Sequence, residues 1–160
     1  MFSVLSALAF PPFGVWWLGL LAPACLLLAS DRLAPGALVG GVQRSGLAAG
    51  AAWAAVGTLP FWAFEQRWIA GVSAAGFVPM LLILAAYMWL AVWACARVLR
   101  WCGSRRAVGL VVLGPIVWGG VEFFRGRVAF DGYPWYLAGI PMIESTFLAS
   151  AGAVVGVYGV

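Results

Sequence analysis

The sequence predicts an all-α fold, a polytopic transmembrane helix bundle of about five to six membrane segments. Of its 160 residues, 65% are hydrophobic and only 9% are charged, and the mean hydropathy is +1.04. Soluble domains carry about 25% charged residues, so a chain with this few could not cover its surface for water. The charges also fall in short gaps between apolar runs, which is the pattern that membrane topology produces.

The apolar runs form one transmembrane domain that covers residues 1–160. The predicted membrane segments are 1–10, 15–29, 45–64, 71–96, 107–124 and 145–160. The first is short, because ten helical residues reach about 15 Å, half of an apolar core of about 30 Å. The last is still apolar at Val160, with no loop or charge after it, so we expect the chain to be C-terminally truncated.

Turn-forming residues separate the first segments. Residues 11–14 (PPFG) predict a turn, since neither proline can donate a backbone hydrogen bond. Trp16 and Trp17 then begin the second segment, where paired Trp suits the headgroup belt. Pro23 predicts a kink within it, and residues 34–36 (APG) predict a loop.

The later segments are bounded in the same way. Residues 65–68 (EQRW) predict a polar turn after the third segment. Pro79 predicts a bend or a late start in the fourth, and residues 103–104 predict the turn after it. Pro115 lies inside the fifth segment.

Arginine counts predict the orientation of the chain. The gaps after the second and fourth segments contain Arg32, Arg44, Arg97, Arg100, Arg105 and Arg106. The gaps after the third and fifth contain Arg67, Arg125 and Arg127, offset by Glu65, Glu122, Asp131 and Glu144. By the positive-inside rule the first set is cytoplasmic. We therefore expect a cytoplasmic N-terminus and an extracytoplasmic loop over residues 125–141.

Several functional classes are disfavoured by composition. His is absent, which removes the usual metal ligand and neutral-pH base. The three cysteines, Cys25, Cys95 and Cys102, form no CxxC pair and are interpreted as small hydrophobic residues rather than nucleophiles. We therefore expect no metal, no cofactor and no catalytic residue in this chain, and no nucleic-acid partner. A transporter is disfavoured because every charge lies near a segment end and no halves repeat.

The candidate functional stretch is residues 121–135 (VEFFRGRVAFDGYPW). Glu122 ends a predicted helix, where the macrodipole disfavours an anion by about 0.3–1 kcal/mol. Arg125 lies three residues later and can neutralise it, while Trp118 lies four residues before it on the same face. Two interpretations stay open: a structural ion pair that closes the helix, or one wall of a substrate pocket. In the second, Arg125 or Arg127 would meet an anionic headgroup or phosphate.

The same stretch closes with Gly132, Tyr133, Pro134 and Trp135. Tyr133 precedes a proline and is biased toward extended backbone, so the segment is expected to be irregular. Its aromatic side chains suit either an interfacial anchor or a ligand contact, and both alternatives stay open. Together with Glu122 and Arg125, these four residues are the predicted substrate-binding or domain-docking residues.

These motifs resemble the membrane domain of the apolipoprotein N-acyltransferases. The pattern Glu-x-x-Arg-Gly falls on Glu122, Arg125 and Gly126, followed by Gly132–Trp135 and then Gly156–Gly159. Residues 8–12 (LAFPP) resemble the first turn of that family and residues 86–87 (AY) its fourth span. The likeness covers essentially the whole chain in the family order. The short first span and Asp131 before Gly132 depart from the family pattern.

The resemblance implies a bacterial plasma (inner) membrane protein with about eight spans in its full form. Such enzymes transfer an acyl chain from a phospholipid to the N-terminal diacylglyceryl-cysteine of a lipoprotein. Their Glu-Lys-Cys triad lies in an extracytoplasmic nitrilase-like domain, which is expected downstream of these residues. Because this chain has no Lys, the triad cannot be assembled from it, and we expect the chain alone to be inactive. The alternative is a non-enzymatic membrane anchor or assembly module for a partner such as a polyprenol-phosphate mannosyltransferase.

Overall fold

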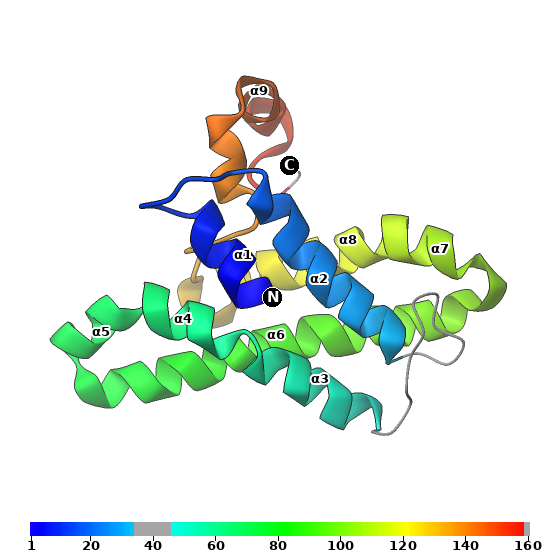
Figure 1. Ribbon diagram of the computed structural model, residues 1–160, viewed down its shortest axis with the longest axis horizontal. Helices are drawn as coiled ribbons and strands as arrows, with labels where there is room; N and C mark the ends of the chain where they lie inside the picture. The colour runs from blue at the N-terminus through cyan, green and yellow to red at the C-terminus, as the bar shows by residue number, and fades with distance from the viewer. Residues whose placement is uncertain (34–45, 159–160) are drawn as a thin grey trace.

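The computed structural model describes residues 1–33 and 46–158, and within these ranges it contains helices and no strand (Figure 1). The predicted all-α class is therefore confirmed. The α-helices are α1 Phe2–Ala9, α2 Leu18–Arg32, α3 Leu47–Val56, α4 Leu59–Glu65, α5 Arg67–Val72, α6 Ala74–Cys102, α7 Arg106–Val108, α8 Gly114–Phe123 and α9 Thr146–Val155. The loop predicted at 34–36, Arg44, and the last residue of the Gly156–Gly159 motif lie outside the described ranges.

In residues 1–33 and 46–158, two π-helical and three 3-10 segments connect or extend these helices. The π segments are Gly109–Leu113 and Phe124–Val128, so residues 106–128 form one helical run rather than ending at 124 as predicted. The 3-10 segments are Gly103–Arg105, Ala129–Asp131 and Ile140–Glu144. The predicted last segment is helical only to Val155, because Gly156 has a φ of +72° and leaves the helix.

The third predicted segment is divided into α3 and α4. The break falls at Gly57 and Thr58, and the Thr58 hydroxyl donates to the carbonyl of Ala55 at 2.6 Å. The polar turn predicted at 65–68 is wrong in extent, because only Gln66 separates α4 from α5. Glu65, Gln66 and Arg67 are all good helix formers, so the helical path resumes within one residue.

Helix α6 is the longest α-helix among the described residues; it begins at Ala74, later than the predicted 71, and ends at Cys102, beyond the predicted 96. Its first turn is capped by Ser73, whose hydroxyl accepts a hydrogen bond from the amide of Gly76 at 3.1 Å. It continues through Arg97 and Arg100 because cations are stabilising near a helix C-terminus. Gly103, with a φ of +51°, then ends it, and the chain reverses toward α7 and α8 (Figure 1).

Most of the other helices pack against α6. Helices α2, α3, α4, α5 and α8 all contact it, and α1 packs against α2 and α4. The buried side chains of α6 recur every three or four residues, which places them on one face: Leu84, Tyr87, Met88, Ala91, Val92, Cys95, Ala96 and Leu99.

The polar connections lie at two different ends of the bundle. At one end, Arg106 pairs with Asp31 at 2.8 Å and Arg100 donates to the carbonyl of Leu33 at 3.0 Å. At the other, the Tyr133 hydroxyl donates to Gln66 Oε1 at 2.7 Å. The gaps after the second and fourth predicted segments, which the arginine counts assign to the same side of the membrane, are therefore in contact with each other. Which end faces the cytoplasm stays a prediction.

Much of the outer surface is apolar. Two described stretches, Leu47–Glu65 and Ala74–Val128, are long and apolar enough to cross a bilayer by length and composition. Many large apolar side chains are exposed, and five of them are each between 63% and 80% exposed: Val72, Leu82, Val111, Ile116 and Phe147. Contiguous exposed apolar surface is rare on soluble monomers and marks contact with a membrane or another protein.

Candidate functional site

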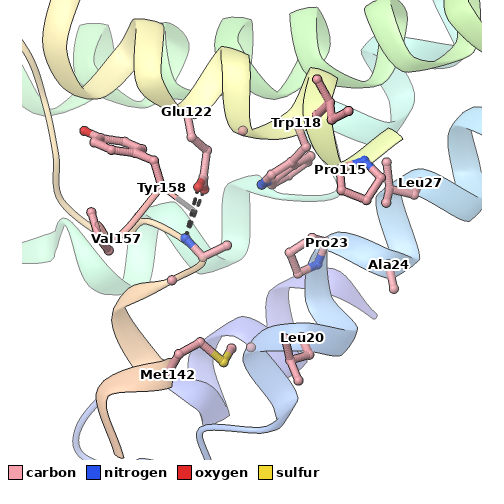
Figure 2. Close-up of a pocket in the computed structure, with 15 residues that line it drawn as sticks. Leu20, Pro23, Ala24, Leu27, Pro115, Trp118, Glu122, Met142, Val157 and Tyr158 are labelled. Atoms are coloured by element: carbon pink, nitrogen blue, oxygen red, sulfur yellow. Dashed lines mark hydrogen bonds between the residues drawn. The ribbon is translucent and has the colours of Figure 1, made fainter. Parts of the chain in front are cut away.

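A cavity of about 620 Å³ opens between α2, α8 and the segment that precedes α9 (Figure 2). This volume lies within the range of small-molecule sites, about 300–1,000 Å³. Its lining comes from two helices, the 138–142 region and the end of the described chain: Gly19, Leu20, Pro23, Ala24, Leu27, Pro115, Ile116, Trp118, Gly119, Glu122, Ala138, Gly139, Met142, Val157 and Tyr158. Apart from Glu122 and the Trp118 indole, the side chains that face it are mostly apolar.

The sequence of the two helices explains why they leave this space. On α8 the lining residues 115, 118, 119 and 122 follow helical spacing and form one face. On α2 the same holds for residues 19, 20, 23, 24 and 27. Gly19, Ala24 and Gly119 carry little or no side chain, and Pro23 cannot donate its hydrogen bond within α2. The two faces therefore meet without filling the gap.

Glu122 lies at the edge of the cavity and is 7% exposed. Its Oε1 accepts a hydrogen bond from the backbone amide of Ala138 at 3.0 Å, and Oε2 from the same amide at 3.3 Å (Figure 2). The carboxylate therefore fastens the loop after α8 to the end of that helix. Its cavity side remains lined by apolar groups and the Trp118 ring.

The direct Glu122–Arg125 ion pair, one of the two interpretations that the sequence left open, is not formed between these side chains. In the described part of the chain these two side chains form no salt bridge; Arg125 Nη1 donates instead to the carbonyl of Trp135 at 2.9 Å. The reason is local geometry. The helix widens into the π segment at Phe124, so a spacing of three residues no longer stacks the two side chains on one α-helical face.

Arg125 is nevertheless among the most buried residues, with 1% exposure. Its guanidinium carbon lies 5.5 Å from the ring centroid of Trp62, a cation–π distance. Its backbone carbonyl accepts from the amide of Tyr133 at 2.7 Å. Arg125 thus holds the 132–135 loop through its side chain and its backbone together.

The four predicted loop residues have different surroundings. Gly132 has a φ of +92°, and a Cβ there would overlap the carbonyl oxygen of Gly126, so only glycine fits. Tyr133 is directed inward to Gln66, whereas Pro134 is exposed and Trp135 is 59% exposed. None of these four lines the large cavity. Of the predicted site residues, Glu122 therefore lines the cavity, whereas the loop 132–135 lies outside its lining.

Two tyrosines of this loop are neutral hydrogen-bonding groups. Burial raises the pKa of Tyr133 above its usual value, despite the opposing effect of Arg125. Burial, followed by the nearby Glu65 carboxylate, raises the pKa of Tyr136 to about 12. Both phenols therefore stay protonated at neutral pH and serve as donors and packing groups rather than bases.

Tyr136 and the α2 face were missed by sequence reasoning. Tyr136 has a φ of +56° and packs with Phe10 and Phe61, at centroid distances of 5.1 and 5.9 Å. No local motif signals that role, since its partners are more than 70 residues away in sequence. The α2 face could have been found, because Gly19, Pro23 and Leu27 recur at a spacing of four.

Arg127, considered as a phosphate contact, is exposed and does not line the cavity. Residues 1–33 and 46–158 contain no cluster of three or more His, Cys, Asp or Glu side chains that could hold a metal ion.

The fold and the site first define a class: an all-helical domain with a largely apolar exterior and a mostly apolar cavity lined by one carboxylate, Glu122. Comparison with known proteins then defines the family. The sequence model of the apolipoprotein N-acyltransferase N-terminal domain matches residues 2–160, and the chain belongs to this family. The resemblance drawn from the motifs is therefore confirmed.

A curated relative, the apolipoprotein N-acyltransferase of Geobacter metallireducens, is 31% identical over 165 residues. The match covers 98% of this chain and 29% of the relative, so the chain spans less than a third of that protein's length. No solved structure matches the chain.

Proposed function

We propose that this chain is the membrane-embedded N-terminal part of an enzyme that transfers an acyl chain from a phospholipid to the N-terminal diacylglyceryl-cysteine of lipoproteins. Family membership supports the reaction class, since the relative is named an apolipoprotein N-acyltransferase. The 620 Å³ cavity carries the proposal for this chain. Its apolar lining and its single carboxylate suit a hydrocarbon chain with a polar end.

The apolar surface supports a placement in the bilayer. Exposed Val, Leu, Ile and Phe side chains would be solvated by lipid tails, and the arginines gathered around α2 and α6 would face the headgroups. We place the chain in the bacterial inner membrane as five to six membrane segments. The N-terminus would be cytoplasmic and the 125–141 loop extracytoplasmic.

The chemistry itself would belong to a downstream nitrilase-like domain. In such a domain a Cys thiolate, assisted by Glu and Lys, would attack the phospholipid ester and release the lysophospholipid, which leaves the acyl group on Cys as a thioester. The lipoprotein amine would then attack the thioester, form the amide and release the Cys thiolate. The loop 132–135 would present the exposed Trp135 ring to that domain or to the lipid headgroup. Glu122 and Arg125 would keep this loop in place through Ala138 and Trp135.

The cavity is tested by filling it. Ala24 lines the cavity from α2, and Ala24→Phe adds a ring into the space without adding charge. In the full-length enzyme in membranes, we expect this variant to lower acyl transfer to a diacylglyceryl peptide several-fold while the protein level is kept. Ala52→Phe on the exposed face of α3 is the matched control and should transfer normally. Equal activity of the two variants would contradict the proposed role of the cavity.

The downstream coding sequence separates this proposal from the anchor alternative. A following nitrilase-like domain with Glu, Lys and Cys supports acyl transfer. A glycosyltransferase domain in that position would instead support an anchor for a polyprenol-phosphate mannosyltransferase.

A further inference from the structure

A second, much smaller cavity lies inside the helix packing and differs in chemistry from the first. Its volume is about 20 Å³, and it shares Trp118, Glu122 and Ala138 with the large cavity. On its other sides it is lined by Ser6, Trp62, Arg125 and Tyr136, and apolar side chains complete the wall. Six side chains that carry polar atoms, from α1, α4, α8, the π segment after α8 and the loop at Tyr136, therefore converge on one small space.

Several N–H groups around this space are buried and lack a protein acceptor. Among the described residues, Arg125 Nε and Nη2 and Trp62 Nε1 have no hydrogen-bond partner, whereas the Trp118 indole N–H interacts with the Glu122 carboxylate. Arg125 and Trp62 are each 1% exposed, so bulk solvent cannot reach them. Buried polar groups in native proteins are almost always hydrogen-bonded, and ordered water serves where the protein does not.

The size and charges of the space select the ligand. A cavity needs about 10–15 Å³ of this kind of volume to hold one water molecule, so about 20 Å³ admits one and excludes a phosphate or a headgroup. An anion would suit the donors but would be repelled by the Glu122 carboxylate. Water suits both, because its oxygen accepts from guanidinium and indole N–H groups while its hydrogens donate to a carboxylate.

We infer that one internal water molecule occupies this cavity and bridges Arg125 to Glu122, as a water-mediated ion pair. This arrangement explains why two opposite charges remain buried side by side without a direct contact. Each of the two charged residues also bonds the loop, Glu122 at Ala138 and Arg125 at Trp135. The water would therefore join α4, α8 and the loop at one point. The inference concerns packing and is independent of the acyl-transfer proposal.

The test uses the 160-residue chain in lipid nanodiscs with ¹⁵N-labelled Trp indoles. Trp62→Phe and Trp118→Phe assign two indole signals by loss of one signal each. We expect water-to-indole cross-peaks from a long-lived water at one or both of these protons. Trp53, which is 74% exposed, is the control and should show none from a long-lived water. Absence of such cross-peaks at both Trp62 and Trp118 would overturn the inference.

Two further measurements define the ligand. Replacing chloride with bromide should leave the Trp62 and Trp118 signals unchanged, and a shift would show an anion in place of water. Arg125→Met removes two of the donors, so the cross-peak should be lost while Trp53 is unaffected. If that variant does not fold, the two Phe variants and the bromide exchange decide the question, because they keep every charge.

Discussion

Replacing Arg125 with Met is the sharpest test of the polar layer beneath the loop. Met keeps an unbranched apolar stem but removes the charge and the donors. The Trp135 carbonyl loses its hydrogen bond, and Glu122, 7% exposed, loses the nearest cation. Removing one partner of a buried charged pair costs about 3–5 kcal/mol. Because Glu122 keeps the Ala138 amide, we expect the free energy of unfolding to fall by about 3 kcal/mol.

The measurement is reversible unfolding of the chain in mixed micelles, followed by far-UV circular dichroism. Arg127→Met is the matched control, because Arg127 lies in the same π segment but is exposed. It should change the free energy of unfolding by less than about 0.5 kcal/mol. The double variant Glu122→Gln/Arg125→Met removes the uncompensated carboxylate. It should therefore be about 0.5–3 kcal/mol more stable than the sum of the single effects predicts.

Two results would refute this reasoning. If Arg125→Met were as stable as Arg127→Met, the buried guanidinium would not support the loop. If the double variant were strictly additive, Glu122 and Arg125 would act on the loop separately, and their proximity would carry no energetic coupling.

Three further predictions address the loop, its exposed ring and the orientation. Gly132→Ala places a Cβ against a backbone carbonyl at a φ of +92°, so it should lower the free energy of unfolding by about 1–3 kcal/mol. The control is Gly120→Ala, because a Cβ at Gly120 meets open space. It should raise the free energy of unfolding by up to about 1 kcal/mol in the same assay. Trp135→Ala in a full-length enzyme should lower acyl transfer without loss from the membrane, and unchanged transfer would remove Trp135 from the site. In intact cells an impermeant thiol reagent should label a single Cys at Ala129 but not at Ser104; the reverse pattern would invert the topology.

The fold class was accessible from sequence because it depends on local composition. A chain with few charges and long apolar runs lies in lipid, where every backbone N–H and C=O must find a hydrogen-bond partner within the protein. An α-helix provides these partners within one segment. The ends of the helices were less accessible. The break at Gly57 and the continuation of α6 through Arg100 each depend on packing or on interactions at a helix end that are worth about 1 kcal/mol. The spacing of apolar residues carries no information about such interactions.

In the site, the charged residues could be found from the local sequence, whereas their hydrogen-bond partners in the loop could not. Glu122 and Arg125 were found because two opposite charges three residues apart are conspicuous in an apolar chain. Their partners, the Ala138 amide and the Trp135 carbonyl, are backbone groups that any sequence would supply. The π segment at Phe124 then separates the charges that the α-helical spacing would have joined.

This separation has a physical consequence for the loop. A direct Glu122–Arg125 pair would satisfy both side chains within the helix and leave the 132–138 backbone without these bonds. With the pair opened by the π segment, each charged group is available to one backbone group of the loop. Hydrogen bonds to charged groups contribute about 1.5–3 kcal/mol each. Two of them are sufficient to hold an irregular loop beside the cavity, which is where a domain that acts on the contents of that cavity would need a fixed surface.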